Sequence, residues 1–164
     1  METTPVSNRM YGLAVLYEMN TDFFNRVLDG ISDEDAHNRL NTKANHIAWI
    51  TGSLVYERYE LAKELGIDLS PSTAELHKDH KGIQDGAQYP SLSEYKKDWE
   101  NISALLLEAL QKVSDERLDK PFEMPGESMS FFDLISFMAY RESNCIGQIA
   151  LWRRLLGYDA MKYQ

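Results

Sequence analysis

The sequence is poor in cysteine, in basic residues and in long apolar runs, and each shortage excludes a class of protein. Cys145 is the single cysteine among 164 residues, so the internal disulfide framework that holds many small secreted domains together cannot form. Lys and Arg number 17 against 26 Asp and Glu, which gives a formal net charge of -9. This excess repels nucleic-acid phosphates and anionic membrane surfaces, so we expect neither as a partner.

No stretch approaches the roughly 20 uninterrupted apolar residues of a membrane-spanning helix. Residues 1–10 contain no apolar run behind a basic start, so we expect no signal peptide and a cytoplasmic location. Hydrophobic residues make up 43% of the chain and charged residues 26%, close to the average for globular proteins. A chain of this length and composition is expected to form one domain, residues 1–164, around a hydrophobic core.

Four segments have the spacing of amphipathic helices, with apolar residues recurring three and four positions apart. They cover residues 8–28, 44–65, 91–113 and 130–156. Ser91 and Glu94 form a capping-box pattern at the start of the third segment, and Gly66 and Gly157 follow the second and fourth, where glycine commonly ends a helix. No segment shows a convincing period of two. The prediction is therefore an all-α fold, an antiparallel four-helix bundle.

The connections between these helices differ in length. Residues 32–35 read as a capped short turn after the first helix. A long connection, residues 66–90, joins the second and third helices; we expect it to lie across the end of the bundle and to contain a short helix at 72–77. Residues 119–129, which contain two prolines and a glycine, are expected to form a loop.

Polar residues interrupt the apolar stripes of the second and fourth predicted helices, and these interruptions indicate a site. Arg141 and Gln148 lie on or beside the inward stripe of the fourth helix, and Ser53 and Glu57 share a face of the second. Burial without partners would destabilise each of them, and two polar patches that face each other across a bundle resolve this. The candidate pocket residues are His46, Trp49, Ser53, Glu57, Arg141, Cys145 and Gln148.

Two of these residues have alternative interpretations. Arg141 either reaches outward or pairs with a carboxylate such as Glu57 or Glu142, or it holds a small anion together with Ser53. Cys145 is either a small core residue or a thiol that the neighbouring cation of Arg141 activates. No histidine is placed beside this thiol to act as its base.

Residues 140–149, Tyr-Arg-Glu-Ser-Asn-Cys-Ile-Gly-Gln-Ile, and the ending Leu-Trp-Arg-Arg-Leu-Leu-Gly at 151–157 resemble the fourth helix of the DinB/YfiT-like superfamily. Members commonly carry two histidines four residues apart before the Ile-Gly-Gln. Residues 45–54 are similar to the stretch of the family in which Trp and Gly precede a ligand histidine, and residues 125–130 look like its counterpart loop. The resemblance covers essentially the whole chain in element order and implies the same bundle.

The resemblance also implies a divalent metal, zinc or nickel, held by three histidines and used by hydrolases and by transferases of low-molecular-weight thiols. In this chain the three ligand positions are Ser53, Arg141 and Cys145. A guanidinium cannot lose its proton to ligate a metal, and one cysteine cannot make a site alone. We therefore expect no metal or other cofactor there. His77 and His80 have metal-like spacing, but they lie in the polar connection, where a solvated loop is the expected state.

The leading hypothesis is a DinB-like protein without enzymatic activity, which binds a small ligand, an anion included, or acts as an interaction module. The alternative is a metal-dependent or cysteine-based transferase or hydrolase related to the thiol S-transferases, with Cys145 activated by Arg141. Bundles of this type often pair through helix faces, so we also expect a homodimer.

Overall fold

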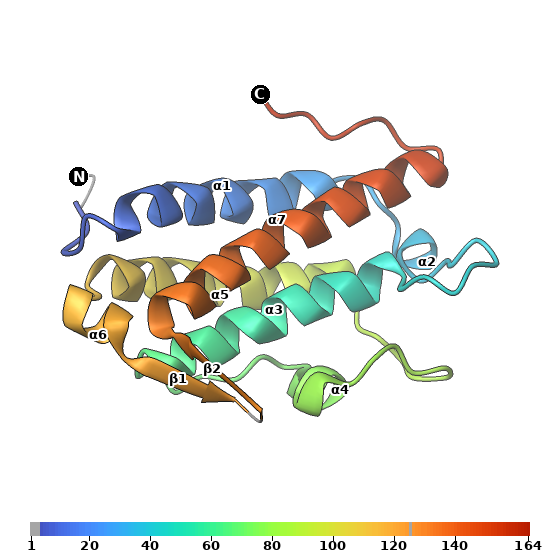
Figure 1. The fold of residues 1–164 in the computed structure, drawn as a ribbon. Helices are drawn as coiled ribbons and strands as arrows, with labels where there is room; N and C mark the ends of the chain where they lie inside the picture. Colours follow the sequence, from blue (N-terminus) through green and yellow to red (C-terminus); the bar gives the residue numbers. More distant parts are fainter. Residues whose placement is uncertain (1–3, 125) are drawn as a thin grey trace.

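The computed structural model describes residues 4–124 and 126–164, and its frame is four long helices. These are α1 (Met10–Leu28), α3 (Ile47–Glu64), α5 (Leu92–Gln111) and α7 (Phe131–Leu155). Figure 1 shows α1 beside α7 and α3 beside α5, with the two pairs packed against each other. The predicted all-α bundle is confirmed, and each predicted long helix is present within a few residues of its expected ends.

The direction of each helix follows from the side chains that it joins to its neighbours. The α1 residues Tyr17 and Thr21 are bonded to Ser103 and Trp99 of α5 in descending order, so α1 and α5 are antiparallel. By contrast, α1 and α7 are parallel, because their bonded residues rise in number together: Asn20 donates to the Ala139 carbonyl, and Arg153 donates to the Val27 carbonyl. The same reasoning makes α3 and α5 parallel neighbours, since Gly52 lies against Tyr95 and Arg58 bonds Ser103.

Parallel neighbours require the connection between them to return along the bundle rather than across its end. The connection between α3 and α5 does so, and it carries α4 (Ala74–His77) and the single turn η1 (Lys78–His80). Ser72 bonds Asp98 on the way back, and His77 lies against Gly52 near the start of α3. The expected short helix is confirmed in part by α4, whereas the expected course across the bundle end was wrong.

Local hydrogen bonds explain where the helices begin. Ser91 and Glu94 complete the predicted capping box of α5, and Ser130 and Asp133 do the same for α7. The short α2 (Asp33–Ala36) is capped by the Ser32 hydroxyl, which accepts from the Asp35 amide. A further short helix, α6 (Asp115–Asp119), follows α5 and is capped in the same way by Ser114. Such caps satisfy amides that the first turn of a helix leaves unpaired.

A small hairpin replaces part of the loop expected at 119–129. Strands β1 (Pro121–Met124) and β2 (Glu127–Ser130) are antiparallel, with Pro121 opposite Ser130. Pro125 of the predicted loop lies outside the described residues, and Gly126 has the positive φ of +84° that a tight turn requires. Sequence periodicity missed these strands because each has four residues and one begins with proline, too little for a period of two to be recognised.

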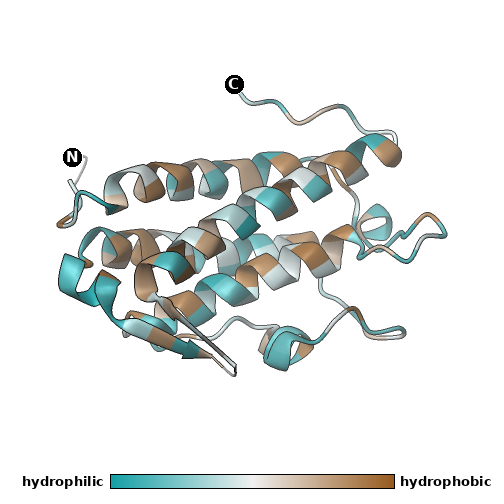
Figure 2. Cartoon of the chain, viewed as in Figure 1, coloured by the Kyte–Doolittle hydropathy of each residue, from teal (hydrophilic) through white to brown (hydrophobic). Residues whose placement is uncertain are grey.

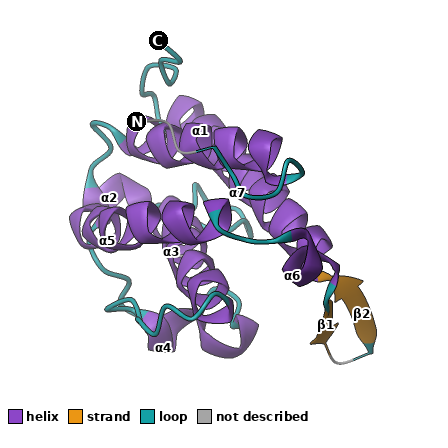
Figure 3. Ribbon diagram, turned by 90° about the vertical axis from the view of Figure 1, so that its left-hand side faces the viewer, coloured by secondary structure: helices purple, strands orange, loops and turns teal. Residues whose placement is uncertain are grey.

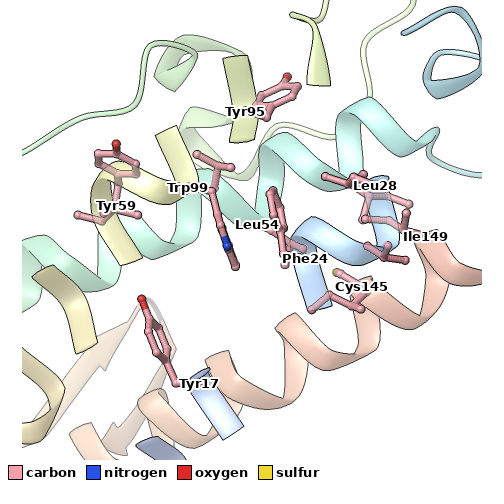
Figure 4. Close-up of a cluster of buried hydrophobic side chains, with 14 of the residues drawn as sticks. Tyr17, Phe24, Leu28, Leu54, Tyr59, Tyr95, Trp99, Cys145 and Ile149 are labelled. Carbon is pink, nitrogen blue, oxygen red and sulfur yellow. The ribbon is translucent and has the colours of Figure 1, made fainter. Parts of the chain in front are cut away.

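The hydrophobic core is centred where the four long helices meet. Trp99 is fully buried and stacks on Phe24 with 3.9 Å between ring centroids and 10° between planes, as Figure 4 shows beside Leu54 and Cys145. Apolar and polar segments alternate along α1, α5 and α7, as Figure 2 shows, so each helix has one face for the core. None of the helices in the described part of the chain is both long and apolar enough to span a bilayer.

Candidate functional site

Arg141 of α7 reaches across the bundle to α3. Its Nη1 pairs with Glu57 Oε2, and its Nη2 donates to Ser53 Oγ at 3.0 Å. The side chains of Arg141 and Glu57 are 25% and 18% exposed, so the pair lies at the edge of the core rather than on the surface. Of the interpretations open to Arg141, the structure supports the ion pair with Glu57.

A second ion pair, fully buried, lies immediately beside the first. Arg58 Nε donates to Glu142 Oε1 at 2.6 Å and Arg58 Nη2 donates to Glu142 Oε2 at 2.9 Å. The remaining Nη1 donates to Thr21 Oγ1 at 2.9 Å and to Ser103 Oγ at 2.7 Å. The guanidinium carbon also lies 3.4 Å from the ring centroid of Trp99, within the range of a cation–π interaction. This pair therefore has hydrogen-bond partners on all four long helices.

The two ion pairs join consecutive residues of each helix, and the acid and the base change places between them. Glu57 and Arg58 on α3 meet Arg141 and Glu142 on α7, so each helix contributes one acid and one base. The group, which we call the α3–α7 charge clamp, is neutral as a whole, and neutrality is what allows charges to remain in a core. Sequence reasoning had paired Glu142 only with Arg141, and it missed Arg58.

A sequence signal for Arg58 was nevertheless present. Arg58 falls four residues after Leu54 and three before Leu61, on the face of the second predicted helix that faces the core. Glu142 likewise falls four residues before Ile146 on the fourth. Two charges of opposite sign at core positions of facing helices indicate a buried pair.

Burial raises the pKa of Glu57 to about 7, and the nearby Glu142 carboxylate acts in the same direction, while Arg141 opposes both. The carboxyl of Glu57 therefore titrates near neutral pH rather than in the acid range usual for glutamate. Protonation of Glu57 would remove the negative charge that pairs with the fixed charge of Arg141. The outer half of the charge clamp is consequently sensitive to pH.

Cys145 lies one turn beyond Arg141 on α7 and is buried in the core, as was predicted for one of its two interpretations. Burial raises the pKa of its thiol, and the opposing effect of Arg141 is smaller. The four histidines lie elsewhere: His37 and His46 before α3, and His77 and His80 in the connection. The thiol thus has neither a depressed pKa nor an imidazole base, both of which a cysteine nucleophile needs.

The other candidate residues lie apart from the charge clamp. His46 caps α3, because its Nδ1 accepts from the Trp49 amide at 3.0 Å, and burial lowers its pKa to about 4. Trp49 is half-buried and faces the connection, with its ring 6.0 Å from that of His77. Gln148 is exposed, and its amide donates to Asn144 on the outer face of α7. Gln148 therefore lies beside the inward stripe, one of the two positions expected for it, and does not reach Arg141 or Ser53.

The exposure of Gln148 has a geometric cause. The buried centre of α7 runs through Ile135, Glu142 and Ile149, one residue further along than the stripe inferred from the sequence. Arg141 at the margin of this stripe is long enough to reach α3. Gln148 is shorter, and from the same margin it remains in solvent.

His77 and His80 do not form a joint site. His77 is 3% exposed, so the expectation of a solvated loop was wrong for it, whereas His80 is exposed. Within 4–124 and 126–164, no group of three or more His, Cys, Asp and Glu side chains is placed to hold a metal ion. At the inferred ligand positions, the Arg141 guanidinium bonds Ser53 and Glu57. A fixed cation among the donors does not fit zinc or nickel.

The fold and the clamp define a class of protein, a bundle of four long helices with a polar contact between the second and the fourth. Residues 16–149 match the sequence profile of the DinB superfamily. Because that match spans most of the chain, the chain belongs to the DinB superfamily, and the resemblance to this family is confirmed. A comparison with curated proteins finds no match.

Proposed function

We propose that this chain is a DinB-superfamily protein without enzymatic activity, and that it acts by pairing with a second copy of itself through the outer face of α1 and α7. Its α3–α7 charge clamp is then a structural element in the place where relatives hold a metal. Two features of the residues support the lack of catalysis: Arg141 is neutralised by Glu57, and the thiol of Cys145 is buried without a base. These same features argue against the metal-dependent or cysteine-based alternative.

The observation that carries the pairing is an apolar groove of about 210 Å³ between α1 and α7, which Met161 and Tyr163 of the C-terminal segment also line. Leu16 and Phe23 of α1 and Ile146 and Ala150 of α7 are among its lining residues. Large apolar side chains that are more than two-fifths exposed lie on the same two helices, and Met19 among them lines the groove. They include Tyr11, Val15 and Met19 on α1 and Tyr140, Leu151 and Leu155 on α7. Contiguous exposed apolar surface of this kind marks interaction sites on soluble proteins.

Two glycines on this face support a close approach by another helix. A Cβ added at Gly12, in the first turn of α1, or at Gly147, in the interior of α7, would meet nothing within 4 Å, so no contact among the described residues requires glycine there. Glycine weakens a helix interior relative to alanine by roughly 0.5–1 kcal/mol. A partner helix that packs closely against these two positions would explain why they are occupied by glycine. A second copy is the natural partner, because a two-fold interface places the same face on both sides.

The test compares the oligomeric state of two variants, each of which replaces an exposed leucine by glutamate. We expect the parent to sediment as a dimer at micromolar concentration, and the substitution Leu151→Glu to raise the dissociation constant at least tenfold. Leu105→Glu is the control, since Leu105 is also an exposed leucine but lies on α5. A parent that remains monomeric at hundreds of micromolar, or equal effects of the two substitutions, would overturn the proposal.

A second candidate function, the binding of a small anion at Arg141, is favoured by the raised pKa of Glu57. Below that pKa, a carboxylate or phosphate group could replace the protonated Glu57 as the partner of the guanidinium. Acetate titrated by NMR should therefore bind more tightly at pH 5.5 than at pH 8. The variant Glu57→Gln should bind acetate with little difference between the two pH values. Binding that persists in Arg141→Met would exclude this site.

A further inference from the structure

His77 projects from the connection into a group of aromatic rings between α3 and α5. The rings of Trp49, Tyr56, Tyr89 and Tyr95 have centroids 6.0–6.4 Å from that of His77. Figure 3 shows α4, which ends at His77, lying along α3. His77 is 3% exposed although it belongs to a segment that is otherwise mostly solvated. We call the four rings the aromatic cage.

Four polar atoms of His77, Trp49 and Tyr95 lack hydrogen-bond partners in the described part of the chain, whereas the Tyr89 hydroxyl accepts from the Gln84 backbone amide. Both ring nitrogens of His77, the Tyr95 hydroxyl and the Trp49 Nε1 are buried and unpaired among the described residues. Buried polar groups in folded proteins are nearly always hydrogen-bonded, since an unpaired one loses its hydration without compensation. Three side chains that share this defect at one place indicate a site in which another molecule supplies the partners.

Gly52 gives the cage its depth. A Cβ added at Gly52 would lie 2.3 Å from His77 Nε2 and 2.6 Å from the Tyr95 hydroxyl oxygen. Both polar atoms therefore rest directly against the backbone of α3, in a space that any other residue would fill. A glycine in the middle of a long helix weakens it, and here the gain is room for a flat ring.

We propose that the aromatic cage is a binding site for a small, flat, neutral heteroaromatic molecule, and that the imidazole of His77 occupies it as an internal stand-in on a movable segment. The chemistry of the walls selects this class of ligand. Trp49 Nε1 can only donate, so the ligand needs an acceptor such as a ring nitrogen, and the Tyr95 hydroxyl can accept or donate. The faces of the four rings provide stacking surface.

The charged groups around the cage lie at its margins. Glu60, Lys63 and Asp79 act on Tyr56, and Glu94 and Asp98 act on Tyr95. Burial lowers the pKa of His77 to about 4, so the stand-in ring is itself neutral at ordinary pH. The carboxylates at the margins would repel an anionic ligand, and burial disfavours a cation here as it disfavours the protonated form of His77, so a neutral ligand is favoured.

The segment that carries His77 is anchored at both ends, and between them it is held by long hydrogen bonds of 3.3 Å from the Gln84 and Lys81 side chains and by the packing of Leu76 against the core. The Ser72 amide and hydroxyl donate to Asp98 at 2.8 and 2.7 Å, and beyond η1 the Tyr89 hydroxyl accepts from the Gln84 amide at 3.0 Å. Between these anchors α4 has four residues and no side-chain cap. A ligand that displaces His77 would return both ring nitrogens to water, which removes their unpaired state.

The probe for this proposal is imidazole itself, titrated into the full chain while the Trp49 indole N–H resonance is followed by NMR. We expect the parent to bind imidazole weakly and the variant His77→Ala to bind it at least tenfold more tightly, because no side chain has to be displaced. His80→Ala is the matched control, an exposed histidine of the same segment, and should behave as the parent. Tyr95→Phe in the His77→Ala background should weaken binding several-fold.

Each outcome of the imidazole titration either supports or overturns the proposal. No shift of the Trp49 resonance in either protein at 100 mM imidazole, a concentration chosen far above that of the protein, overturns the proposal. Binding by His77→Ala alone also overturns it, because the site would then be only a cavity that the substitution creates. If His77→Ala does not fold, the parent is compared with Tyr95→Phe, and equal shifts of the Trp49 resonance count against the cage.

Discussion

Arg58 on α3 and Glu142 on α7 hold each other by two hydrogen bonds, 2.6 and 2.9 Å long, at the centre of the bundle. One position earlier on each helix, Glu57 and Arg141 form a second pair of opposite sense that is partly open to solvent. The side chains of the inner pair are 1% and 6% exposed, whereas those of the outer pair are 25% and 18% exposed. The two halves of the charge clamp therefore differ in what they contribute to stability.

The substitution Glu142→Gln tests the inner pair. It preserves the size of the side chain but leaves Arg58 as a buried charge without a counter-charge, so we expect the free energy of unfolding to fall by about 3–5 kcal/mol. Urea denaturation of parent and variant measures this loss. The control is Asp119→Asn, which removes an exposed carboxylate 2.6 Å from Arg9, and it should change stability by less than about 1 kcal/mol. A loss equally small for Glu142→Gln would contradict the assignment.

Glu57 makes stability depend on pH in the direction opposite to a usual salt-bridged acid. Its folded-state pKa, about 7, lies above the ordinary value of 4.5, so the folded chain binds the proton more tightly than the unfolded chain. The stabilisation that this proton provides is complete below about pH 4.5 and is lost as the pH rises through 7. Urea titrations between pH 4.5 and 8 should show this decline.

The control for that decline is Glu57→Gln, which cannot titrate and should abolish this part of the pH dependence. The difference between parent and variant should change by on the order of 2 kcal/mol across the range. A pH profile that is the same in both proteins would show that the Glu57 pKa is not raised. An opposite slope would mean that the ion pair with Arg141 outweighs burial.

Cys145 should react slowly with a bulky thiol reagent in the folded protein. Burial raises the pKa of its thiol, so both access and thiolate formation limit the reaction. Labelling with a chromogenic disulfide should be at least a hundredfold slower in buffer than in denaturant. The variant Ser93→Cys is an internal control, because Ser93 is exposed and its replacement should label at once. Rapid labelling of the parent would support the alternative that the chain is a cysteine-based enzyme.

The sequence was sufficient for features that depend on one segment alone. The spacing of apolar residues fixes each long helix, and Ser91 with Glu94 fixes the start of α5. The contact of Arg141 with Glu57 was one of several alternatives that the sequence left open, and the structure selects it. The features that followed from the sequence are local, or they need only the order of the helices.

Features that depend on the rotation of one helix against another did not follow. A stripe inferred from periodicity is uncertain by about one residue, so the sequence left open whether Gln148 lies on or beside the stripe, and it did not identify Arg58 as a core residue. The burial of His77 depends on the parallel course of α3 and α5, which brings the connection back along α3. Sequence spacing contains no information about that return.

The last prediction concerns the inferred ligand positions. Ser53 Oγ lies 3.0 Å from Arg141 Nη2, so side chains from these two positions meet between α3 and α7. Cys145 follows Arg141 by four residues, and side chains four apart on a helix project together. The combined substitutions Ser53→His, Arg141→His and Cys145→His should therefore create a site for a divalent metal beside Glu57, with three imidazoles in place of the fixed cation.

Calorimetric titration with zinc and with nickel compares this triple variant with the parent, which should bind neither metal at these positions. Removal of Arg141 leaves Glu57 without its counter-charge, so the metal-free variant should be less stable than the parent, and added metal should restore stability as it binds the folded state. The matched control combines Ser53→Ala, Arg141→Met and Cys145→Ala, which also removes the cation but supplies no ligand. If the folded triple-histidine variant binds no more metal than that control, then Ser53, Arg141 and Cys145 do not occupy the ligand positions of the superfamily.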